Sequence, residues 1–258
     1  MSDFEMQDKT EETRICGKNA VLEAFRSGRT VDRLYVQKDL RDRKLDTILR
    51  EAKKQGTLLR FCTKEKMNEM AQGESHQGVI ATTSVIPYAK MEDLFKRAEE
   101  AGEPPFFLLL DEVEDPHNLG AILRTACVAG AHGVIIPKVR SAGLTAAAFR
   151  ASAGAASHVP VVRVGNLVQT MEGLKKQGLW FVAADMKGQC MYDLDLTGPM
   201  VLVVGNEGRG VSRIVSEHCD YIASIPMHGD LGSLNVSVAL GVLGYEIVRQ
   251  RRIKGEWK

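Results

Sequence analysis

Short, unbroken runs of apolar residues separated by helical stretches are the feature that most limits the fold of this chain. The clearest runs are Phe106–Leu110 (FFLLL) and Met200–Val204 (MVLVV). A strand that is apolar on both sides must be covered on both sides, which is characteristic of a parallel sheet flanked by helices. The pattern predicts strands at 106–112, 133–136, 159–164, 180–185, 200–205 and 221–227, with helices between them and a final helix over about 235–252. We therefore expect an α/β domain with a mostly parallel sheet over residues 106–258.

The part of the chain before residue 87 has its own order of signals. Apolar residues at helical spacing around 20–25 and 45–52 alternate with strand-like stretches at 33–37, 58–62 and 79–85. These signals predict a small α/β module over 14–86. A charged helical stretch and Pro104-Pro105 then indicate a linker over 87–105.

Composition limits the class of protein. The chain has 258 residues, 44% of them hydrophobic and 26% charged, which excludes disorder or a coiled coil as the main architecture. No apolar run approaches the ~20 residues that span a bilayer, and the N-terminus lacks the features of a signal peptide, so we expect a cytoplasmic protein without a membrane segment. The five cysteines form no C-x-x-C pair, and we expect reduced thiols.

The charges are unevenly distributed, although the formal net charge is only +1. Residues 14–60 hold 13 Lys or Arg against 6 acids, an excess of +7, whereas residues 1–13, expected to form a flexible acidic tail, hold 5 acids and 1 lysine. A basic module favours a polyanion partner. The alternative is a solvated helix face. The residues expected to bind a nucleic acid are Arg14, Lys18, Arg26, Arg29, Arg41, Arg43 and Lys44.

The loop after the first strand of the large domain places a cation among small side chains. Ligands of open parallel sheets bind beyond the carboxyl ends of the strands. Within 111–138, Pro116 and Asn118 suit a turn and a helix cap, and Arg124 follows with Gly120 and other small residues at helical spacing around it. Another backbone or a ligand could therefore approach the guanidinium. Asn118 as a simple cap and Arg124 as a surface or dimer ion pair are the alternatives.

The loop after the strand at 200–205 is rich in glycine. Its sequence, Gly205-Asn206-Glu207-Gly208-Arg209-Gly210, lets backbone groups come close to a ligand. The order G-x-x-G-x-G differs from the dinucleotide motif, and no Walker motif occurs, which disfavours an ordinary Rossmann dehydrogenase and a P-loop NTPase. A tight strand-to-helix turn is the alternative, with Glu207 in a structural pair with Arg209 or a backbone N–H.

The third loop lies just before the last helix. Gly229 and Gly232 make it flexible, and Ser233 and Asn235 stand where the helix begins, able to cap it or to bind a ligand. The helix carries an apolar stripe that must pack on the core or on a second subunit. The stripe consists of Val236, Ala239, Leu240, Leu243 and Ile247.

Two common chemistries lack support in the sequence. The six histidines show no H-x-x-x-H or H-E-x-x-H spacing, so no metal site is predicted. Ser152 in RASAG lacks the first glycine of a nucleophile elbow, which disfavours a serine hydrolase.

The three loops, in this order, resemble the three motifs of the SpoU/TrmH family in the SPOUT superfamily of RNA 2'-O-methyltransferases. The matching segments are NLGAILRTA, LVVGNEGRGVS and IPMHGDLGSLNVSVA, and the resemblance covers residues 106–252, including SAGLTAAAFRASAGAASHVPVVRV. GKNAVLEAFRSGRTVDRLYV, residues 17–36, looks like the start of the small L30e-like RNA-binding domain of the branch that acts on 23S rRNA. Within the family the chain looks most like the bacterial enzymes that methylate a guanosine ribose in the peptidyl-transferase region.

The resemblance implies a fold and a cofactor. It implies a deep C-terminal trefoil knot, a rare exception among protein chains, and a homodimer formed through the catalytic domain. It also implies that S-adenosylmethionine binds bent between the loops. The cofactor-binding residues so implied are Ala184, Gly205, Asn206, Glu207, Gly208, Ile225, Met227, Leu234 and Asn235.

The resemblance implies catalytic residues as well. They are Asn118, Arg124, Glu207, Ser233 and Asn235, with Arg124 of one subunit reaching the cofactor of the other. A guanidinium is not deprotonated in proteins, so we interpret Arg124 as stabilising the developing alkoxide and holding an RNA phosphate while the proton leaves to phosphate or water. A family member that acts on tRNA and a non-catalytic RNA-binding protein are the alternatives.

Overall fold

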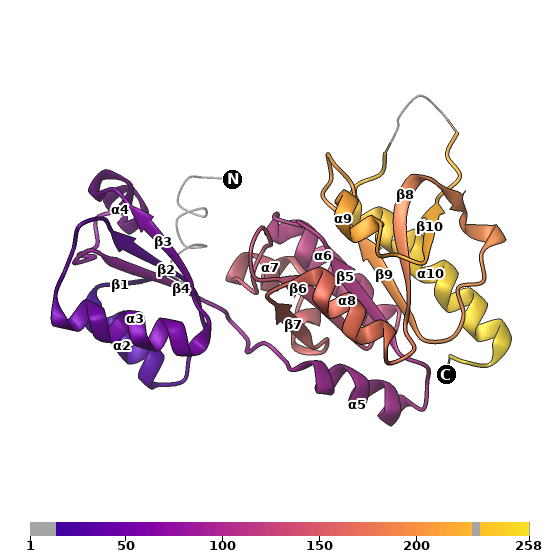
Figure 1. Ribbon diagram of the computed structural model, residues 1–258, viewed down its shortest axis with the longest axis horizontal. Helices are drawn as coiled ribbons and strands as arrows, with labels where there is room; N and C mark the ends of the chain where they lie inside the picture. The colour runs from indigo at the N-terminus through magenta and orange to yellow at the C-terminus, as the bar shows by residue number, and fades with distance from the viewer. Residues whose placement is uncertain (1–13, 229–232, 258) are drawn as a thin grey trace. The chain divides into compact units, whose positions relative to one another are not determined.

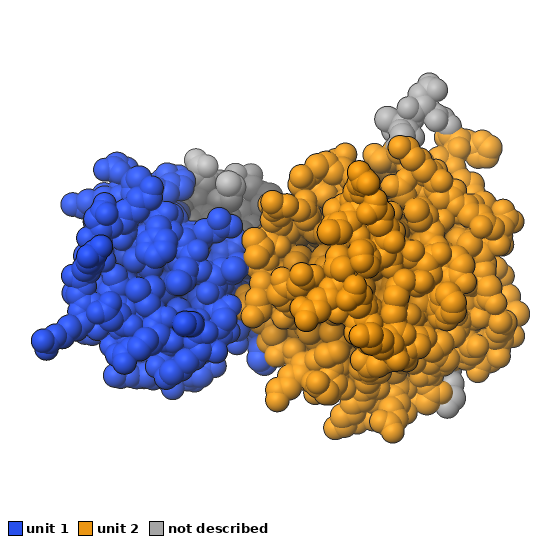
Figure 2. Space-filling model, in the orientation of Figure 1, with its two compact units in different colours: residues 1–87, 143–147 blue, residues 88–142, 148–258 orange. Residues whose placement is uncertain are grey.

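The computed structural model describes residues 14–228 and 233–257, which form two compact units (Figures 1 and 2). Unit 1 comprises the described residues up to Pro87 together with Gly143–Ala147. Unit 2 comprises Tyr88–Ala142 and the chain from Ala148 onward. The tail predicted at 1–13 and the glycines of the third loop, Gly229 and Gly232, lie outside the described residues.

Unit 1 contains a four-stranded mixed sheet. Its elements are β1 (Arg14–Cys16), α2 (Lys18–Arg26), β2 (Val31–Gln37), α3 (Arg43–Gln55), β3 (Leu58–Cys62), α4 (Lys64–Ala71) and β4 (Val79–Thr83). The strand order is β1-β4-β2-β3, in which β4 is antiparallel to β1 and β2, and β3 is parallel to β2. Sequence patterns had not predicted β1, which is only three residues long, or α4.

Both faces of this sheet are covered. On one face, Val21 and Phe25 of α2 and Ile48 of α3 pack with Leu34 of the sheet. On the other face, Met67 of α4 packs with Ile80 of β4 and its neighbours. The amphipathic spacing of α2 and α3 therefore reflects burial against the sheet, which leaves their charged faces in solvent.

The larger part of the chain follows a strand–helix alternation. Its elements are α5 (Met91–Ala101), β5 (Phe106–Leu110), α6 (Pro116–Val128), β6 (Gly133–Pro137), α7 (Ala146–Ala151), η1 (Ala155–Ser157), β7 (Val161–Val164), α8 (Leu167–Lys175), β8 (Trp180–Cys190), η2 (Met191–Asp193), β9 (Met200–Val204), α9 (Arg213–Ser216), β10 (Tyr221–Ser224) and α10 (Val236–Lys254). The six strands of unit 2 run in the order β10-β8-β9-β5-β6-β7, and all neighbouring strands are parallel. The prediction of an α/β fold with a mostly parallel sheet is thus confirmed.

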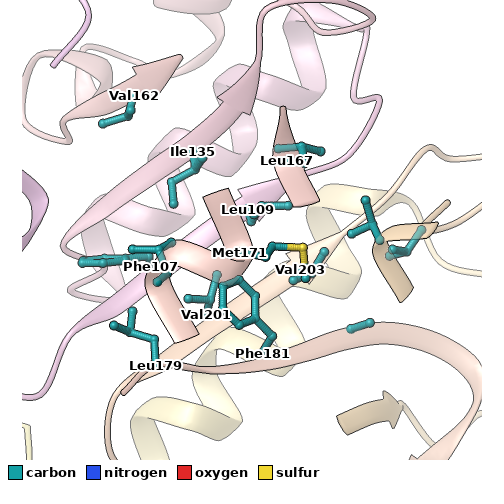
Figure 3. Packing of buried hydrophobic residues seen from close by; sticks show 14 of the residues in the cluster. Phe107, Leu109, Ile135, Val162, Leu167, Met171, Leu179, Phe181, Val201 and Val203 are labelled. Carbon is teal, nitrogen blue, oxygen red and sulfur yellow. The ribbon is translucent and has the colours of Figure 1, made fainter. Parts of the chain in front are cut away.

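The apolar runs that led to this prediction form the centre of the core. Figure 3 shows Phe107, Phe181, Val201 and Val203 of the sheet packed with Met171 of α8, all fully buried. β5 and β9 are adjacent and buried along their whole length. Burial on both faces explains why these strands contain no alternating polar residues.

Helix α5, within the segment predicted as a linker, is part of unit 2 and packs against its sheet. Leu94 and Ala98 of α5 are buried, and Leu94 belongs to the same apolar cluster as Phe107. A Cβ at Gly133 of β6 would overlap the Leu94 side chain, so this glycine makes room for the helix.

The cap of α6 differs from the sequence expectation. Asp115, not Asn118, is the N-cap: its Oδ1 accepts the N–H of His117 at 2.9 Å, and Pro116 is the first helical residue. Proline is favoured there because its fixed φ suits a helix start and it lacks an N–H that would need a partner. Asn118 is therefore free of the capping role and lies buried in the first turn.

Gly120, which lies four residues before Arg124, serves packing within unit 2. A Cβ at Gly120 would lie 2.6 Å from the Ala148 carbonyl oxygen and would overlap Ala151 of α7. The absence of a side chain at Gly120 thus allows the backbone of α7 to approach α6; the sequence had suggested the approach of a backbone or a ligand. α6 also packs against α10.

A buried charged cluster lies at the opposite ends of the strands from the loops described below. Arg251 of α10 donates hydrogen bonds to the carbonyl oxygens of Pro104 at 3.0 Å and Pro105 at 2.8 Å. Burial lowers the pKa of Arg251 to about 10 and that of His132 to about 4. His132 is thus neutral, and its Nδ1 accepts the N–H of Phe106 at 3.0 Å.

None of the described helices is long and apolar enough to cross a membrane.

Candidate active site

A pocket of about 520 Å³ lies beside the middle of β8, where β9 and β10 end and α10 begins. All of its lining residues belong to unit 2. They include Ala184, Gly205, Asn206, Glu207, Gly208, Ile225, Met227, Ser233 and Leu234, together with Asp185, Met186, Lys187, Arg209, Val236, Ala239 and Leu243. Eight of the nine predicted cofactor-binding residues thus line one cavity, and Asn235 lies next to it in the chain.

The glycine loop after β9 folds back on itself. The backbones of Asn206 and Gly210 exchange two hydrogen bonds of 2.9 and 2.8 Å. Gly210 adopts φ +68°, and a Cβ at Gly205 would overlap the Gly210 carbonyl group. Only glycine fits both positions. A Cβ at Gly208 would meet only the Asn206 Oδ1, at 3.7 Å.

A segment of β8 forms another wall of the pocket. β10 pairs with β8 at Val182 and Ala183 and again at Gln189 and Cys190. The residues between these positions leave the ladder, and the Asp185 Oδ1 accepts the Lys187 N–H at 2.9 Å. β8 is therefore longer than the predicted strand at 180–185, because its last residues pair again after the interruption.

Asn235 joins the three loops. Its Nδ2 donates to the Asn118 Oδ1 at 3.1 Å and to the Glu207 Oε1. Its Oδ1 accepts the Ser237 N–H at 2.9 Å, which caps α10. One amide side chain thus connects the start of α6, the glycine loop and the start of α10, which we call the Asn235 junction.

Glu207 has a different partner from the one considered in the sequence. Arg209 donates to Glu112 at 2.8 Å and is not paired with Glu207. Glu207 instead accepts from Asn235. Because the partner comes from a distant part of the chain, no local pattern could have identified it.

Two acids after β5 were not among the predicted site residues. Asp111 is buried, and its Oδ2 accepts the Ser212 N–H at 2.7 Å. The carbonyl oxygen of Glu112 accepts from the Asn206 Nδ2 at 3.2 Å. Both contacts fix the glycine loop to the end of β5. The signal was present in the sequence, since two consecutive acids follow a fully apolar strand.

Arg124 is apart from the pocket of its own chain. It is exposed on α6 and is absent from the pocket lining. Within residues 14–228 and 233–257, its side chain makes no hydrogen bond and no ion pair. The structure thus brings Asn118, Glu207, Ser233 and Asn235 to one place and leaves Arg124 outside it.

The predicted RNA-binding residues of unit 1 fall into two groups. Arg14 pairs with Glu74 at 2.9 Å and Lys18 with Asp42, and both basic side chains are largely buried. The Lys18 ammonium lowers the pKa of Asp42, the N-cap of α3. The five others are exposed: Arg26, Arg29, Arg41, Arg43 and Lys44. Arg14 and Lys18 therefore stabilise the unit itself.

Comparison with protein families gives two matches. The SpoU rRNA Methylase family matches residues 105–245, and the family described as RNA 2'-O ribose methyltransferase substrate binding matches residues 14–89. A Bacillus subtilis protein, YacO, assigned to the TrmH family of tRNA/rRNA methyltransferases, is 44% identical over 243 residues, 94% of this chain and 97% of the relative. A Staphylococcus haemolyticus protein with the same family assignment is 40% identical over 247 residues, 95% of this chain and 99% of the relative.

Solved structures resemble the fold as well. The SpoU methyltransferase AviRb from Streptomyces viridochromogenes, crystallised with AdoMet, is 27% identical, with a TM-score of 0.59 over 93% of this chain and 90% of its own. A TrmH/SpoU tRNA modifying enzyme from A. aeolicus is 34% identical, with a TM-score of 0.55 over 64% of this chain and 86% of its own.

Proposed function

The chain belongs to the SpoU/TrmH family of RNA methyltransferases, and on this premise we propose that it methylates the 2'-oxygen of a guanosine ribose in the peptidyl-transferase region of 23S rRNA. The methyl donor is S-adenosylmethionine, with which AviRb was crystallised. The observation that carries the proposal is the Asn235 junction, which joins the three loops beside one pocket.

The pocket suits this donor in size and in chemistry. A volume of about 520 Å³ lies within the ~300–1,000 Å³ typical of small-molecule sites. Ile225, Leu234 and Leu243 supply apolar surface for a purine, and the glycine loop supplies backbone groups for hydrogen bonds. The bound donor provides a methyl group on a positively charged sulfur. We propose that the nine cofactor-binding residues implied by the resemblance hold the donor, with Asn235 acting through Glu207.

A second copy of the chain would bring Arg124 to this pocket. α10 exposes Val238, Val242 and Tyr245, which lie on one side of the helix, and α6 exposes Val128 one turn after Arg124. Apolar side chains gathered on two packed helices indicate an interaction surface. We propose a homodimer through this surface, in which each Arg124 reaches the pocket of the other subunit.

The side chains then divide the work. Arg124 stabilises the alkoxide that develops on the ribose oxygen and holds an adjacent phosphate with its planar group. Asn118, Ser233 and the Asn235 junction orient the ribose and the donor for in-line transfer. The proton leaves to phosphate or water, because a guanidinium does not act as a base in proteins.

Ribosomal RNA is favoured as substrate by unit 1. Residues 14–87 carry 15 Lys or Arg and 9 acids, and the exposed cations named above suit a phosphate backbone. The family that matches residues 105–245 is described as an rRNA methylase family, whereas the A. aeolicus tRNA modifying enzyme aligns over 64% of this chain. A tRNA substrate is the second candidate, because the relatives are named tRNA/rRNA methyltransferases.

The proposal includes the remaining features implied by the resemblance. They are an L30e-like substrate-binding domain over 14–86, a linker over 87–105, and a catalytic domain over 106–258 that holds a deep trefoil knot. The enzyme would act in the cytoplasm, on 23S rRNA or its precursor particle.

Mixing two inactive variants tests the shared site. Arg124→Ala lacks the cation, and Asn235→Asp lacks the junction donor. A mixed dimer contains one complete site, so random mixing should restore about a quarter of the wild-type activity. No recovery in dimers shown to be mixed would place Arg124 in its own subunit's site or outside catalysis. Mass mapping of rRNA and tRNA from cells without the protein identifies the nucleotide, and an unmodified tRNA position would refute the rRNA assignment.

A further inference from the structure

Two exposed arginines from different loops meet at one carboxylate beside the pocket. Arg140 Nη1 donates to Glu112 Oε1 at 2.7 Å, and Arg209 Nη2 donates to Glu112 Oε2 at 2.8 Å. The Glu112 side chain is only 16% exposed, whereas those of Arg140 and Arg209 are 68% and 69% exposed. The carboxylate is thus covered and the two cations face solvent.

The three residues follow β5, β6 and β9, which are neighbours in the sheet. All three strands are parallel, so these residues stand at the same edge as the pocket, and Arg209 itself lines the pocket. Asn206 of the glycine loop bonds the Glu112 carbonyl oxygen. The arginines are therefore held at the rim of the candidate active site.

The backbone is strained at both ends of one of these ion pairs. Glu112 has φ +58° and Arg140 has φ +54°, a region that non-glycine residues rarely adopt. Such strained backbone concentrates at functional sites. Exposed ion pairs contribute little to stability. Folding stability therefore does not account for this arrangement.

The arginines retain most of their hydrogen-bonding capacity. A guanidinium carries five N–H donors, and each of these two uses one on Glu112. Glu112 is the carboxylate that both arginines contact. Asp111 and Glu114 add negative charge near Arg140, and the buried Asp111 carboxylate accepts the Ser212 N–H. The free donors of two fixed, planar cations match the oxygens of a phosphate diester.

We propose that Arg140 and Arg209 form a phosphate clamp that binds the RNA backbone next to the target nucleotide, with Glu112 as its positioning residue. The proposal rests on the RNA methyl transfer proposed above and adds a contact made by unit 2. It predicts that unit 2 contacts the substrate RNA, in addition to the contacts made by the basic module of unit 1.

The test compares Arg140→Ala, Arg209→Ala and Glu112→Gln with Arg213→Ala. Arg213 is a matched control, because it is a 91% exposed arginine of the same unit that pairs with Glu217 one helical turn away. The RNA is a transcript of the peptidyl-transferase region of 23S rRNA. Each clamp arginine variant should raise KM for this RNA about tenfold, and should reduce the slope of log Kd against log salt by ~0.7–0.9. Affinity for S-adenosylmethionine should stay within twofold in Arg140→Ala and Glu112→Gln, whose residues do not line the pocket.

Glu112→Gln separates positioning from contact. It keeps both cations and removes the negative charge between them, so the salt slope should not fall below that of the wild type, while KM rises because the arginines lose their common anchor. KM values equal to that of Arg213→Ala, or a loss of cofactor affinity in place of RNA affinity, would overturn the clamp. If the wild-type protein binds the cofactor but does not methylate this transcript, the target assignment fails. In that case the slopes of log Kd against log salt, compared between the wild type and the arginine variants for the same transcript, still test the clamp.

Discussion

Replacing Asn235 tests whether one amide side chain assembles the site. Asn235→Ala removes the α10 cap, which costs about 1 kcal/mol. It also removes the hydrogen bond to the buried Asn118 Oδ1, and an unsatisfied buried acceptor costs about 1–3 kcal/mol more. The bond to the exposed Glu207 adds little. The free energy of unfolding should therefore fall by about 2–4 kcal/mol.

A second cap in the same unit provides the control. Asn166 caps α8, where its Oδ1 accepts the Gln169 N–H at 3.0 Å, and its side chain makes no junction. Asn166→Ala should cost about 1 kcal/mol and leave methyl transfer unchanged. The difference between the Asn235 and Asn166 variants in urea unfolding measures the junction alone.

Asn235→Asp separates the cap from the junction. A carboxylate still accepts the Ser237 N–H and suits the helix N-terminus, but it cannot donate to Asn118 or Glu207 and it repels Glu207. We expect a protein that is more stable than Asn235→Ala but at least about 100-fold slower in methyl transfer than wild type, measured as kcat with saturating donor. Near-normal kcat in Asn235→Asp, or equal destabilisation by the two alanine variants, would refute the reasoning.

Three further predictions follow from the structure. Gly205→Ala forces a Cβ onto the Gly210 carbonyl, which should lower the free energy of unfolding by about 1–3 kcal/mol and the donor affinity, measured by calorimetry, at least tenfold. Gly208→Ala has room for its Cβ and should leave stability unchanged. Deleting residues 1–85 should remove most RNA affinity in filter binding without changing donor affinity, and undiminished RNA binding would contradict the role of unit 1. Burial lowers the pKa of His132 to about 4, so between pH 6.5 and 4 the unfolded chain binds a proton on this imidazole that the folded chain does not. The free energy of unfolding should therefore fall by about 3 kcal/mol as the pH drops from 6.5 to 4. This dependence of stability on pH should disappear in His132→Gln.

Local sequence was sufficient wherever a property depends on neighbouring residues. Unbroken apolar runs such as Phe106–Leu110 predict buried parallel strands, because a polar residue there would lose water without gaining a partner. The resemblance to a known family, and not local spacing, identified the cofactor-binding residues; eight of them line one pocket because loops after parallel strands gather at one edge of the sheet. The helix spacing of the last segment likewise predicted α10, with Ser233 and Asn235 as the two cap candidates, of which Asn235 is the N-cap.

The sequence did not predict which side chains bond to one another. Arg209 lies two residues from Glu207 but pairs with Glu112, and Asn235 donates to Asn118, which is 117 positions away. Gly120 had indicated the approach of a backbone or a ligand near Arg124, and only the fold showed that the space beside Gly120 is filled by the backbone of α7. Each of these contacts is decided by which loops the sheet order brings together.

The residues by themselves thus determined which segments become strands and helices, and which side chains stand at the strand ends. Only the folded chain decided which of those side chains bond to one another. The physical reason is range: burial and capping act over a few residues, whereas hydrogen bonds and ion pairs join whatever groups the packing of the sheet brings within about 3 Å.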